Sequence, residues 1–263
     1  MPGNPTVLEC QHLCKSYRSR NGSVRALDDV SFSVGEREFL CIVGPSGCGK
    51  TTLLKLIAGL LEPTSGQIIF SEDAANGRPR CAMVFQEHGL FPWMTVMDNV
   101  AFGLEMRGVG QEERHNRARS FIEKVGLVLF AKSYPHELSV GMSQRVGIAR
   151  AFVADAKLLL MDEPFGSLDT QTKRVLQEEL LRIWKEYQKL IVYVTHDIEE
   201  AILLGDRVLV MSGRPGRIRE DIAIPLGRPR DLSGTDDPEV TSIKWHIWKM
   251  LEDEVRSSLW IAS

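Results

Sequence analysis

The amino-acid sequence predicts an α/β protein built on a parallel sheet with helices on both faces. The apolar runs "KLLLMDEP", "KLIVYVTH" and "DRVLVMS" alternate with helical patterns, and the earlier run "REFLCIVG" is β-rich and bounded by glycine. Strands that alternate with helices are joined by crossovers, which favour a parallel sheet. A glycine-rich stretch with a phosphate-binding pattern, "GPSGCGKTT", follows "REFLCIVG".

The N-terminal part is expected to form short strands before and after this core strand. The segments "TVLECQHLCKSY" and "VRALDDVSFSV" flank the polar turn "RSRNGS", and Gly35-Glu36 turns the chain into "REFLCIVG". The segment "TTLLKLIAGLLEP" has helical spacing and ends at Gly59 and Pro63, which are helix-stopping residues. Further strands are expected at "SGQIIF" and "CAMVFQ", separated by the polar loop "SEDAANGRPR".

The periodicity becomes helical between about residues 91 and 150. The segments "TVMDNVAFGLEMRG", "QEERHNRARSFIEKVGL" and "MSQRVGIARAFVADA" all repeat their apolar residues at helical spacing. We therefore expect a helical subdomain inserted in the α/β core, within a main domain that spans residues 1–235.

The last segment, residues 236–263, is expected to be a C-terminal helical extension behind a linker rich in Pro, Gly and Asp. Its apolar residues fall on one helical stripe, which we expect to dock on the core; a partner surface is the alternative. The stripe comprises Val240, Ile243, Ile247, Met250, Leu251, Val255 and Leu259.

Composition is that of an ordinary globular protein. The chain has 263 residues, 43% of them hydrophobic, and a net charge of −3, which offers no reason to expect a nucleic-acid partner. No apolar run approaches the roughly 20 residues that span a bilayer, and the N-terminus lacks the pattern of a secretory signal. We expect a cytosolic protein whose five cysteines, none in a CxxC pair, stay reduced.

The stretch "GPSGCGKTT" fits GxxxxGK[ST] between a predicted strand and a predicted helix. Backbone N–H groups of such a loop and the helix N-terminus bind the β-phosphate. We expect Lys50 to reach the β- and γ-phosphates, Thr51 to bind Mg²⁺ and Thr52 to reach the α-phosphate. A glycine-rich turn without a ligand is the less favoured alternative. The expected nucleotide-binding residues here are Gly44, Pro45, Ser46, Gly47, Cys48, Gly49, Lys50, Thr51 and Thr52.

Two carboxylates, Asp162 and Glu163, end the predicted buried strand "LLLMDEP". Ligands of open α/β sheets bind at the carboxyl ends of the strands. We expect Asp162 to orient Mg²⁺, directly or through water, and Glu163 to polarise the attacking water as general base. A polar exit from a strand is the alternative, which the P-loop makes less favoured.

Three further side chains are weaker candidates by themselves. His196 ends the next predicted strand, where it can touch the γ-phosphate and hold Glu163 and water, although a lone histidine is more often structural. Gln86, at the end of "MVFQ", can be a ligand of water or Mg²⁺. Tyr17 can stack on an adenine ring, although an isolated aromatic residue is more often part of the packing.

Together these motifs resemble the ATP-binding subunit of an ABC transporter. The resemblance runs from about residue 7 to residue 222 and rests on "GPSGCGKTT", "MVFQE", "LSVGMSQR", "LLLMDEP", "GSLD" and "VTHD", in the order of the family. It implies ATP and Mg²⁺ as ligands. It also implies a RecA-like P-loop NTPase core with an antiparallel β subdomain and an inserted helical subdomain.

The same resemblance implies a head-to-tail homodimer in which "LSVGMSQR" of one copy covers the ATP held by the other. Ser139 and the Gly141 N–H group would contact the γ-phosphate, and Asp169 would couple the two sites. Gln86 would begin the segment that senses integral membrane permease subunits. The stretch "HGLFPWMTV" would help to line the groove for a coupling helix of the permease.

The signature departs from the family pattern at two positions, Val140 in place of the usual Gly and Met142 in place of the usual Gln. Valine does not readily take a positive φ and adds a side chain near the phosphate. Our hypothesis is that residue 140 keeps a negative φ, so that closure around ATP survives.

Among ABC subunits, the chain looks most like the nitrate/sulfonate/taurine-type importers, through "FPWMTVMDNVAFGLEMRG" and "VTHDIEEAILLGDRVLVMSGRPGRI". This subfamily implies a small anionic solute, an extracytoplasmic solute-binding protein and a peripheral position on the cytoplasmic face of the membrane. An exporter subunit and a soluble ABC-type ATPase acting on nucleic acid or ribosomes remain as alternatives.

Overall fold

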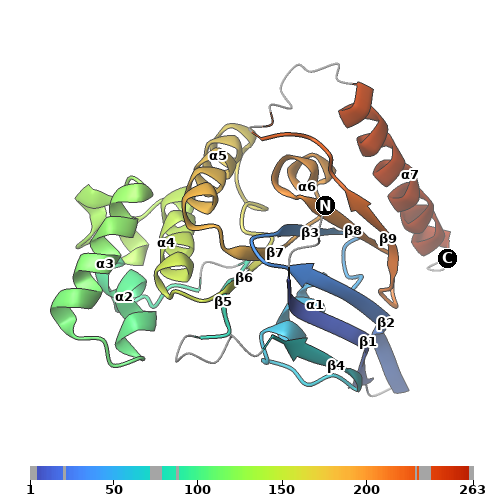
Figure 1. The fold of residues 1–263 in the computed structure, drawn as a ribbon, viewed down its shortest axis with the longest axis horizontal. Coiled ribbons are helices and arrows are strands. Elements are labelled where there is room, and N and C mark those ends of the chain that lie inside the picture. The colour runs from blue at the N-terminus through green and yellow to red at the C-terminus, as the bar shows by residue number, and fades with distance from the viewer. Residues whose placement is uncertain are drawn as a thin grey trace. The chain divides into compact units, whose positions relative to one another are not determined.

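The computed structural model describes residues 5–19, 22–71, 79–86, 89–228, 230 and 238–260, the last stretch without the side chains of residues 253 and 255–260. The chain divides into two compact units (Figure 1). Unit 1 combines residues 1–72 with 190–263, and unit 2 spans residues 73–189. In the part of the chain that is described, no helix is both long and apolar enough to cross a membrane.

Unit 1 contains a three-stranded antiparallel sheet of β1 (Thr6–Ser19), β2 (Gly22–Gly35) and β4 (Ser65–Phe70), in the order β2-β1-β4 (Figure 1). From Asp28 to Val34, β2 alternates buried and exposed residues, and Val30, Phe32 and Val34 are the buried apolar ones. Since successive side chains of a strand point to opposite faces, this sheet buries one face only.

The second sheet region of unit 1 consists of β3 (Phe39–Val43), β7 (Leu190–Thr195), β8 (Arg207–Met211) and β9 (Ile218–Ala223). Strand β3 lies between β7 and β8 and is parallel to both. Every residue of β3 and β7 is buried, which explains their continuous apolar sequences. The antiparallel strand β9 pairs with β8 and was not predicted, because its sequence "IREDIA" is largely polar and exposed.

The described residues of unit 1 also form three helices, α1 (Lys50–Ile57), α6 (Ile198–Leu204) and α7 (Pro238–Trp260). The predicted C-terminal helix is α7, and it contacts α6. Ile247 of the expected apolar stripe is fully buried, while Val240, Ile243, Met250 and Leu251 are partly buried. Side chains of Val255 and Leu259 lie outside the described set.

Unit 2 contains the parallel strands β5 (Cys81–Val84) and β6 (Leu158–Asp162), together with four α-helices in the described residues. The helices are α2 (Val96–Glu105), α3 (Gln111–Lys124), α4 (Val140–Val153) and α5 (Thr170–Tyr187), with short 3-10 turns η2 (Val128–Phe130) and η3 (Pro135–Glu137). Helices α2, α3 and α4 contact one another, and the rings of Phe121 and Phe152 stack across α3 and α4 at 6.4 Å. These contacts bury the apolar stripes that predicted the helical region.

Candidate functional site

The P-loop (residues 44–52) leads from β3 into α1. Gly49 caps the helix with a φ of 115°, a backbone conformation that side chains disfavour. A Cβ at Gly49 would also stand 2.7 Å from Leu27 Cδ2 and 3.0 Å from the carbonyl oxygen of Ala26. Glycine is therefore required here by both the backbone angle and the close approach of β2. Cys48, inside the same turn, is 1% exposed.

The side chain of Lys50 lies along the P-loop. It is 5% exposed, and its Nζ donates hydrogen bonds to the carbonyl oxygens of Gly44 at 2.8 Å and Pro45 at 3.2 Å. The first turn of α1 carries no acidic residue. A helix N-terminus with a lysine and no neighbouring carboxylate on that turn favours an anionic ligand such as a phosphate.

Tyr17 of β1 reaches the start of α1. Its hydroxyl lies 3.4 Å from Thr52 Oγ1, so the structure brings together two residues that the sequence nominated separately. The ring is 39% exposed, and Lys15 Nζ stands 5.4 Å from the ring centroid. An exposed aromatic face beside the P-loop helix can receive a planar ring by stacking.

The acidic residues of unit 2 sit where β6 ends. Strand β6 is fully buried, and Asp162, its last residue, is 3% exposed. Glu163 has a φ of 44°, in the left-handed region that costs a non-glycine residue about 1–3 kcal/mol. Its carbonyl oxygen accepts a hydrogen bond from the Gly166 N–H at 3.1 Å, which closes a turn. The sequence did not reveal this strained backbone, because it depends on the turn that follows.

His196 is an exposed residue held between a buried strand and a capped helix. Thr195 Oγ1 accepts a hydrogen bond from the Asp197 N–H at 3.0 Å, and it also contacts the buried Glu200 carboxylate. Asp197 caps α6 by accepting from the N–H groups of Glu199 and Glu200. These bonds fix the backbone on the C-terminal side of His196.

Gln86 follows β5 and is exposed. The two residues after it are outside the described part of the chain. The structure therefore places the start of the predicted sensing segment and leaves the rest of that prediction untested.

The signature segment (residues 138–145) contains the start of α4. Ser139 is the N-cap, and its Oγ accepts a hydrogen bond from the Met142 N–H at 3.3 Å. Val140 is the first helical residue and is 49% exposed. It is absent from the residues with positive φ, so the hypothesis of an ordinary backbone at residue 140 is confirmed. Gly141 follows in the same turn, where a Cβ would lie 3.2 Å from Thr172 Cγ2.

Asp169 caps α5. Its Oδ1 accepts hydrogen bonds from the Gln171 N–H at 3.1 Å and the Thr172 N–H at 3.0 Å. The bond from Thr172 is the main reason why the pKa of Asp169 lies below its ordinary value. Asp169 is thus an exposed, ionised cap, whatever else it contacts.

Comparison with known proteins shows the family of this chain. The model of the family described as ABC transporter matches residues 27–166. The chain belongs to the ABC transporter family. Relatives include the nitrate import ATP-binding protein NrtD of Synechocystis sp., 48% identical over 83% of both chains. The taurine import ATP-binding protein TauB of Roseobacter denitrificans is 42% identical over 94% of this chain and 96% of its own. The aliphatic sulfonates import ATP-binding protein SsuB of Bacillus cereus is 42% identical over 89% and 92%.

Solved structures agree with the family. The dimeric structure of MJ0796, a bacterial ABC transporter cassette, matches with a TM-score of 0.73 and 31% identity over 84% of this chain and all of the cassette. A post-hydrolysis state of the same cassette, bound to ADP and Pi, matches equally well at 30% identity. The predicted P-loop NTPase fold is confirmed, and this chain is an ATP-binding ATPase.

Proposed function

We propose that this ABC ATPase drives an importer of small anionic solutes. Two copies form a head-to-tail dimer that binds two ATP molecules. Closure of this dimer changes the conformation of a separate membrane permease, which receives its solute from a solute-binding protein. The protein would lie peripherally on the cytoplasmic face of the membrane. The observation that carries the proposal is the high identity, over most of the chain, to relatives named for the import of nitrate, aliphatic sulfonates and taurine. Nitrate and sulfonate groups are both oxyanions, so an oxyanion is the solute class we infer.

In this proposal, separate residues of the chain bind ATP and catalyse its hydrolysis. The P-loop and Lys50 bind the phosphates, and Tyr17 stacks on the adenine. Glu163 accepts a proton from the attacking water, and His196 holds that water near the γ-phosphate. The buried end of β6 and the strained backbone of Glu163 support a site at this position, because strain persists where the surrounding structure enforces it.

Mg²⁺ fits the donor set that the proposal names. The hydroxyl of Thr51, the amide oxygen of Gln86 and the carboxylate of Asp162 are oxygen ligands, which Mg²⁺ prefers. When bound, the ion would neutralise charge on the β- and γ-phosphates. The low exposure of Asp162 supports its role, since a buried carboxylate is most stable beside a cation.

The head-to-tail dimer is supported by the state of the signature segment. Ser139 and Val140 are exposed, and Ser139 caps the N-terminus of α4. In the proposal, this surface meets the nucleotide of a second copy, where the Ser139 hydroxyl and the Gly141 N–H group donate to the γ-phosphate. Asp169 would then lie near the dimer contact.

The permease contact is supported by a rigid, exposed aromatic turn before α2. The fully buried Asn99 donates through Nδ2 to the carbonyl oxygens of Phe91 at 3.1 Å and Met94 at 3.0 Å. Trp93 is 69% exposed and packs on the Phe91 ring at 5.6 Å. A fixed turn with an exposed tryptophan suits a protein partner, because aromatic anchors on rigid backbones lose little entropy on binding.

The enzymatic part is tested with Glu163→Gln. We expect ATP binding to persist and hydrolysis to fall by about 10²–10⁴-fold, the usual contribution of a general base. The variant should then form an ATP-dependent dimer in light scattering, with Lys50→Ala as the monomeric control. Hydrolysis at the wild-type rate would remove Glu163 as the base.

The transport part is tested in cells that lack their own ATPase for oxyanion uptake. Expression of this chain with its permease should restore uptake of nitrate, taurine or an alkanesulfonate, and the Glu163→Gln chain should not. Copurification of the wild-type chain with ribosomes or nucleic acid, without a membrane protein, would contradict the importer.

A further inference from the structure

Residues 212–217, the 212–217 loop, join β8 to β9 and lie against the P-loop. The guanidinium of Arg214 donates to the Gly47 carbonyl oxygen through Nε at 3.3 Å and Nη2 at 3.2 Å. Gly216 lies against the next carbonyl group, because a Cβ there would stand only 2.2 Å from the oxygen of Cys48. Two consecutive carbonyl groups of the P-loop therefore face this loop.

The direction of these carbonyl groups determines the direction of two N–H groups. In a planar trans peptide, the N–H points opposite to the C=O of the same peptide unit. The N–H groups of Cys48 and Gly49 therefore point away from the 212–217 loop. The Cys48 N–H makes a long hydrogen bond, 3.3 Å, to the Pro45 carbonyl oxygen. A phosphate-binding loop binds its ligand through backbone N–H groups. The 212–217 loop therefore orients two N–H groups that can bind phosphate.

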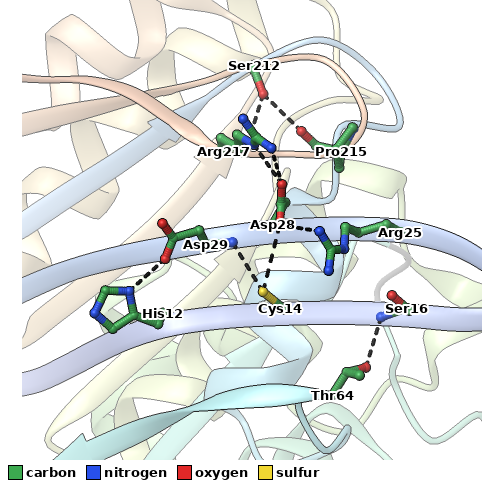
Figure 2. Close-up of polar contacts among 10 residues, drawn as sticks. All are labelled: His12, Cys14, Ser16, Arg25, Asp28, Asp29, Thr64, Ser212, Pro215 and Arg217. Carbon is green, nitrogen blue, oxygen red and sulfur yellow. Dashed lines mark hydrogen bonds and ion pairs between the residues drawn. The ribbon is translucent and has the colours of Figure 1, made fainter.

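The 212–217 loop is itself anchored to β2 (Figure 2). The Gly216 N–H donates to the Ala26 carbonyl oxygen at 2.9 Å, and the Asp28 N–H donates to the Gly216 carbonyl oxygen at 3.0 Å. Arg217 Nε donates to Asp28 Oδ2 at 2.8 Å, and the Arg217 N–H donates to Ser212 Oγ at 3.0 Å. The hydrogen bonds from Arg217 hold the pKa of Asp28 below its ordinary value. Asp28 therefore stays charged at neutral pH, and its ion pair with Arg217 is kept.

The 212–217 loop is also held by α7 through Glu254. Glu254 Oε2 accepts a hydrogen bond from the Gly213 N–H at 2.8 Å, directly before Arg214 in the chain. Its Oε1 accepts from Arg219 Nε at 2.9 Å, just after the loop. One carboxylate of α7 thus bridges the two ends of the turn that carries Arg214.

Two further polar contacts of α7 are weaker, because their side chains are more exposed. Lys244 pairs with Glu199 of α6, and His246 Nε2 lies 2.9 Å from Glu220 of β9. All four of these side chains are about half exposed, and exposed ion pairs contribute little because water and salt screen them. Glu254 is less exposed, at 17% of its side chain, and it reaches a backbone N–H group as well as a charge. Glu254 is therefore a contact through which α7 can act on the loop.

We propose that the 212–217 loop holds the P-loop in its nucleotide-binding conformation, and that Glu254 of α7 holds the 212–217 loop, so that docked α7 raises the affinity for ATP. The proposal rests on the assignment of the P-loop as the ATP site. Arg214, Gly216 and Glu254 are positioning residues, which act on the nucleotide through the P-loop backbone. By linkage, ATP must strengthen the docking of α7 by the same factor.

Gly216→Ala tests the first half of the proposal in the full chain. The φ of Gly216 lies outside the left-handed region, so the added methyl group acts by pressing on the Cys48 carbonyl group and on the Met211 side chain. Gly227→Ala is the matched control, because a Cβ there meets nothing within 4 Å. We expect the dissociation constant for Mg-ATP, measured by calorimetry, to rise about tenfold or more in Gly216→Ala and to stay unchanged in the control. Equal affinities in the two variants would overturn this half.

Arg214→Ala and Glu254→Ala test the second half. Each should raise the dissociation constant for Mg-ATP about threefold to tenfold, less than the loss of a direct charge-assisted contact, because both residues act on the nucleotide through the P-loop backbone. The KM for ATP should rise with it, while kcat at saturating ATP stays near the wild-type value. Arg119→Ala removes an exposed arginine of α3 and should change neither the dissociation constant nor the KM for ATP.

The double variant decides whether the two residues act along one path. If Glu254 acts through the loop, Arg214→Ala with Glu254→Ala should bind ATP no more weakly than Arg214→Ala alone. Strictly additive losses would show that α7 does not act through Arg214 and would overturn the link. The conservative variants Arg214→Lys and Glu254→Gln, each of which keeps one hydrogen bond, should recover part of the affinity if a truncation impairs folding.

Lys50→Ala separates this inference from the proposed function. If Lys50→Ala binds ATP like the wild type, the P-loop assignment fails, and the inference fails with it. If Lys50→Ala loses ATP while Gly216→Ala, Arg214→Ala and Glu254→Ala all bind normally, the inference alone is wrong.

Discussion

The P-loop and the signature segment are both short turns that lead into a helix, and they are stabilised in opposite ways. The P-loop has left-handed glycines, and its Lys50 and Cys48 are almost fully buried. The signature segment has no positive φ, and its Ser139 and Val140 are exposed. The P-loop therefore depends on close neighbours within unit 1, whereas the signature segment is an ordinary capped helix start.

This difference predicts that the signature segment tolerates substitution better than the P-loop does. Residues at the start of α4 need only helical backbone angles and a capping side chain, so Val140 and Met142 fit without strain. Residues of the P-loop must fit between β2 and the 212–217 loop as well as around a ligand. Substitutions in the P-loop should therefore lower both the stability of the fold and the affinity for ATP. Substitutions in the signature segment should leave the stability unchanged and affect only the contact with the nucleotide.

The largest expected contrast compares one glycine from each segment. Gly49→Ala adds a methyl group at a φ of 115° and 2.7 Å from Leu27 Cδ2. We expect loss of ATP binding and a destabilisation of about 1–3 kcal/mol, or several degrees in Tm. Gly141→Ala enters a helix next to Thr172 and should leave the Tm within about 2 °C. Calorimetry of both variants checks this, and an equal loss of Tm would remove the contrast.

Ser139→Asp separates the structural role of the cap from its proposed encounter with phosphate. Aspartate is also a good N-cap and suits the helix dipole, so the Tm should not fall. Its charge would repel the γ-phosphate, and we expect the ATPase rate to fall about tenfold or more. Ser139→Thr, which keeps a neutral hydroxyl, should retain most of the rate. If Ser139→Asp hydrolyses ATP normally, the exposed cap does not meet a nucleotide.

Val140→Gly should have a small effect, because the valine is exposed and helical. The change removes a side chain from the helix and costs at most about 0.5 kcal/mol of stability in its first turn. We expect the ATPase rate, followed by phosphate release, to change less than about threefold. A large gain in rate would mean that Val140 impairs closure in the natural protein.

The smallest expected effect is a dependence of stability on acid pH at Asp169. Its pKa is lower in the folded chain, so its charge stabilises the fold above the ordinary pKa near 3.9. This stabilisation is lost as pH falls through the lowered value. Urea unfolding of wild type and Asp169→Asn should therefore differ at pH 7 and converge toward about pH 3. The same comparison for Ser139→Asn should show no convergence, because the serine cap does not titrate.

Strand β9 shows where local sequence reasoning stops. The strands β3, β6 and β7 are fully buried, so hydrophobicity alone revealed them. Strand β9 exposes most of its residues, and Arg207 of β8 pairs with its Asp221. Its identity as a strand comes from hydrogen bonds to β8, a non-local partner that leaves no periodic signal in "IREDIA". Turn-dependent features such as the φ of Glu163 were missed for the same reason.

The sequence by itself determined the class of the protein, because the P-loop, the acidic strand end and the signature are local patterns whose order identifies ABC ATPases. It also located the residues nominated for ATP, including Lys50 and Glu163. Only the tertiary structure decided that Tyr17 meets Thr52, that Val140 is unstrained, and that Glu254 and Arg214 connect α7 to the P-loop. These contacts join residues that are far apart in the chain, and a sequence pattern does not show which distant residues lie close together in space.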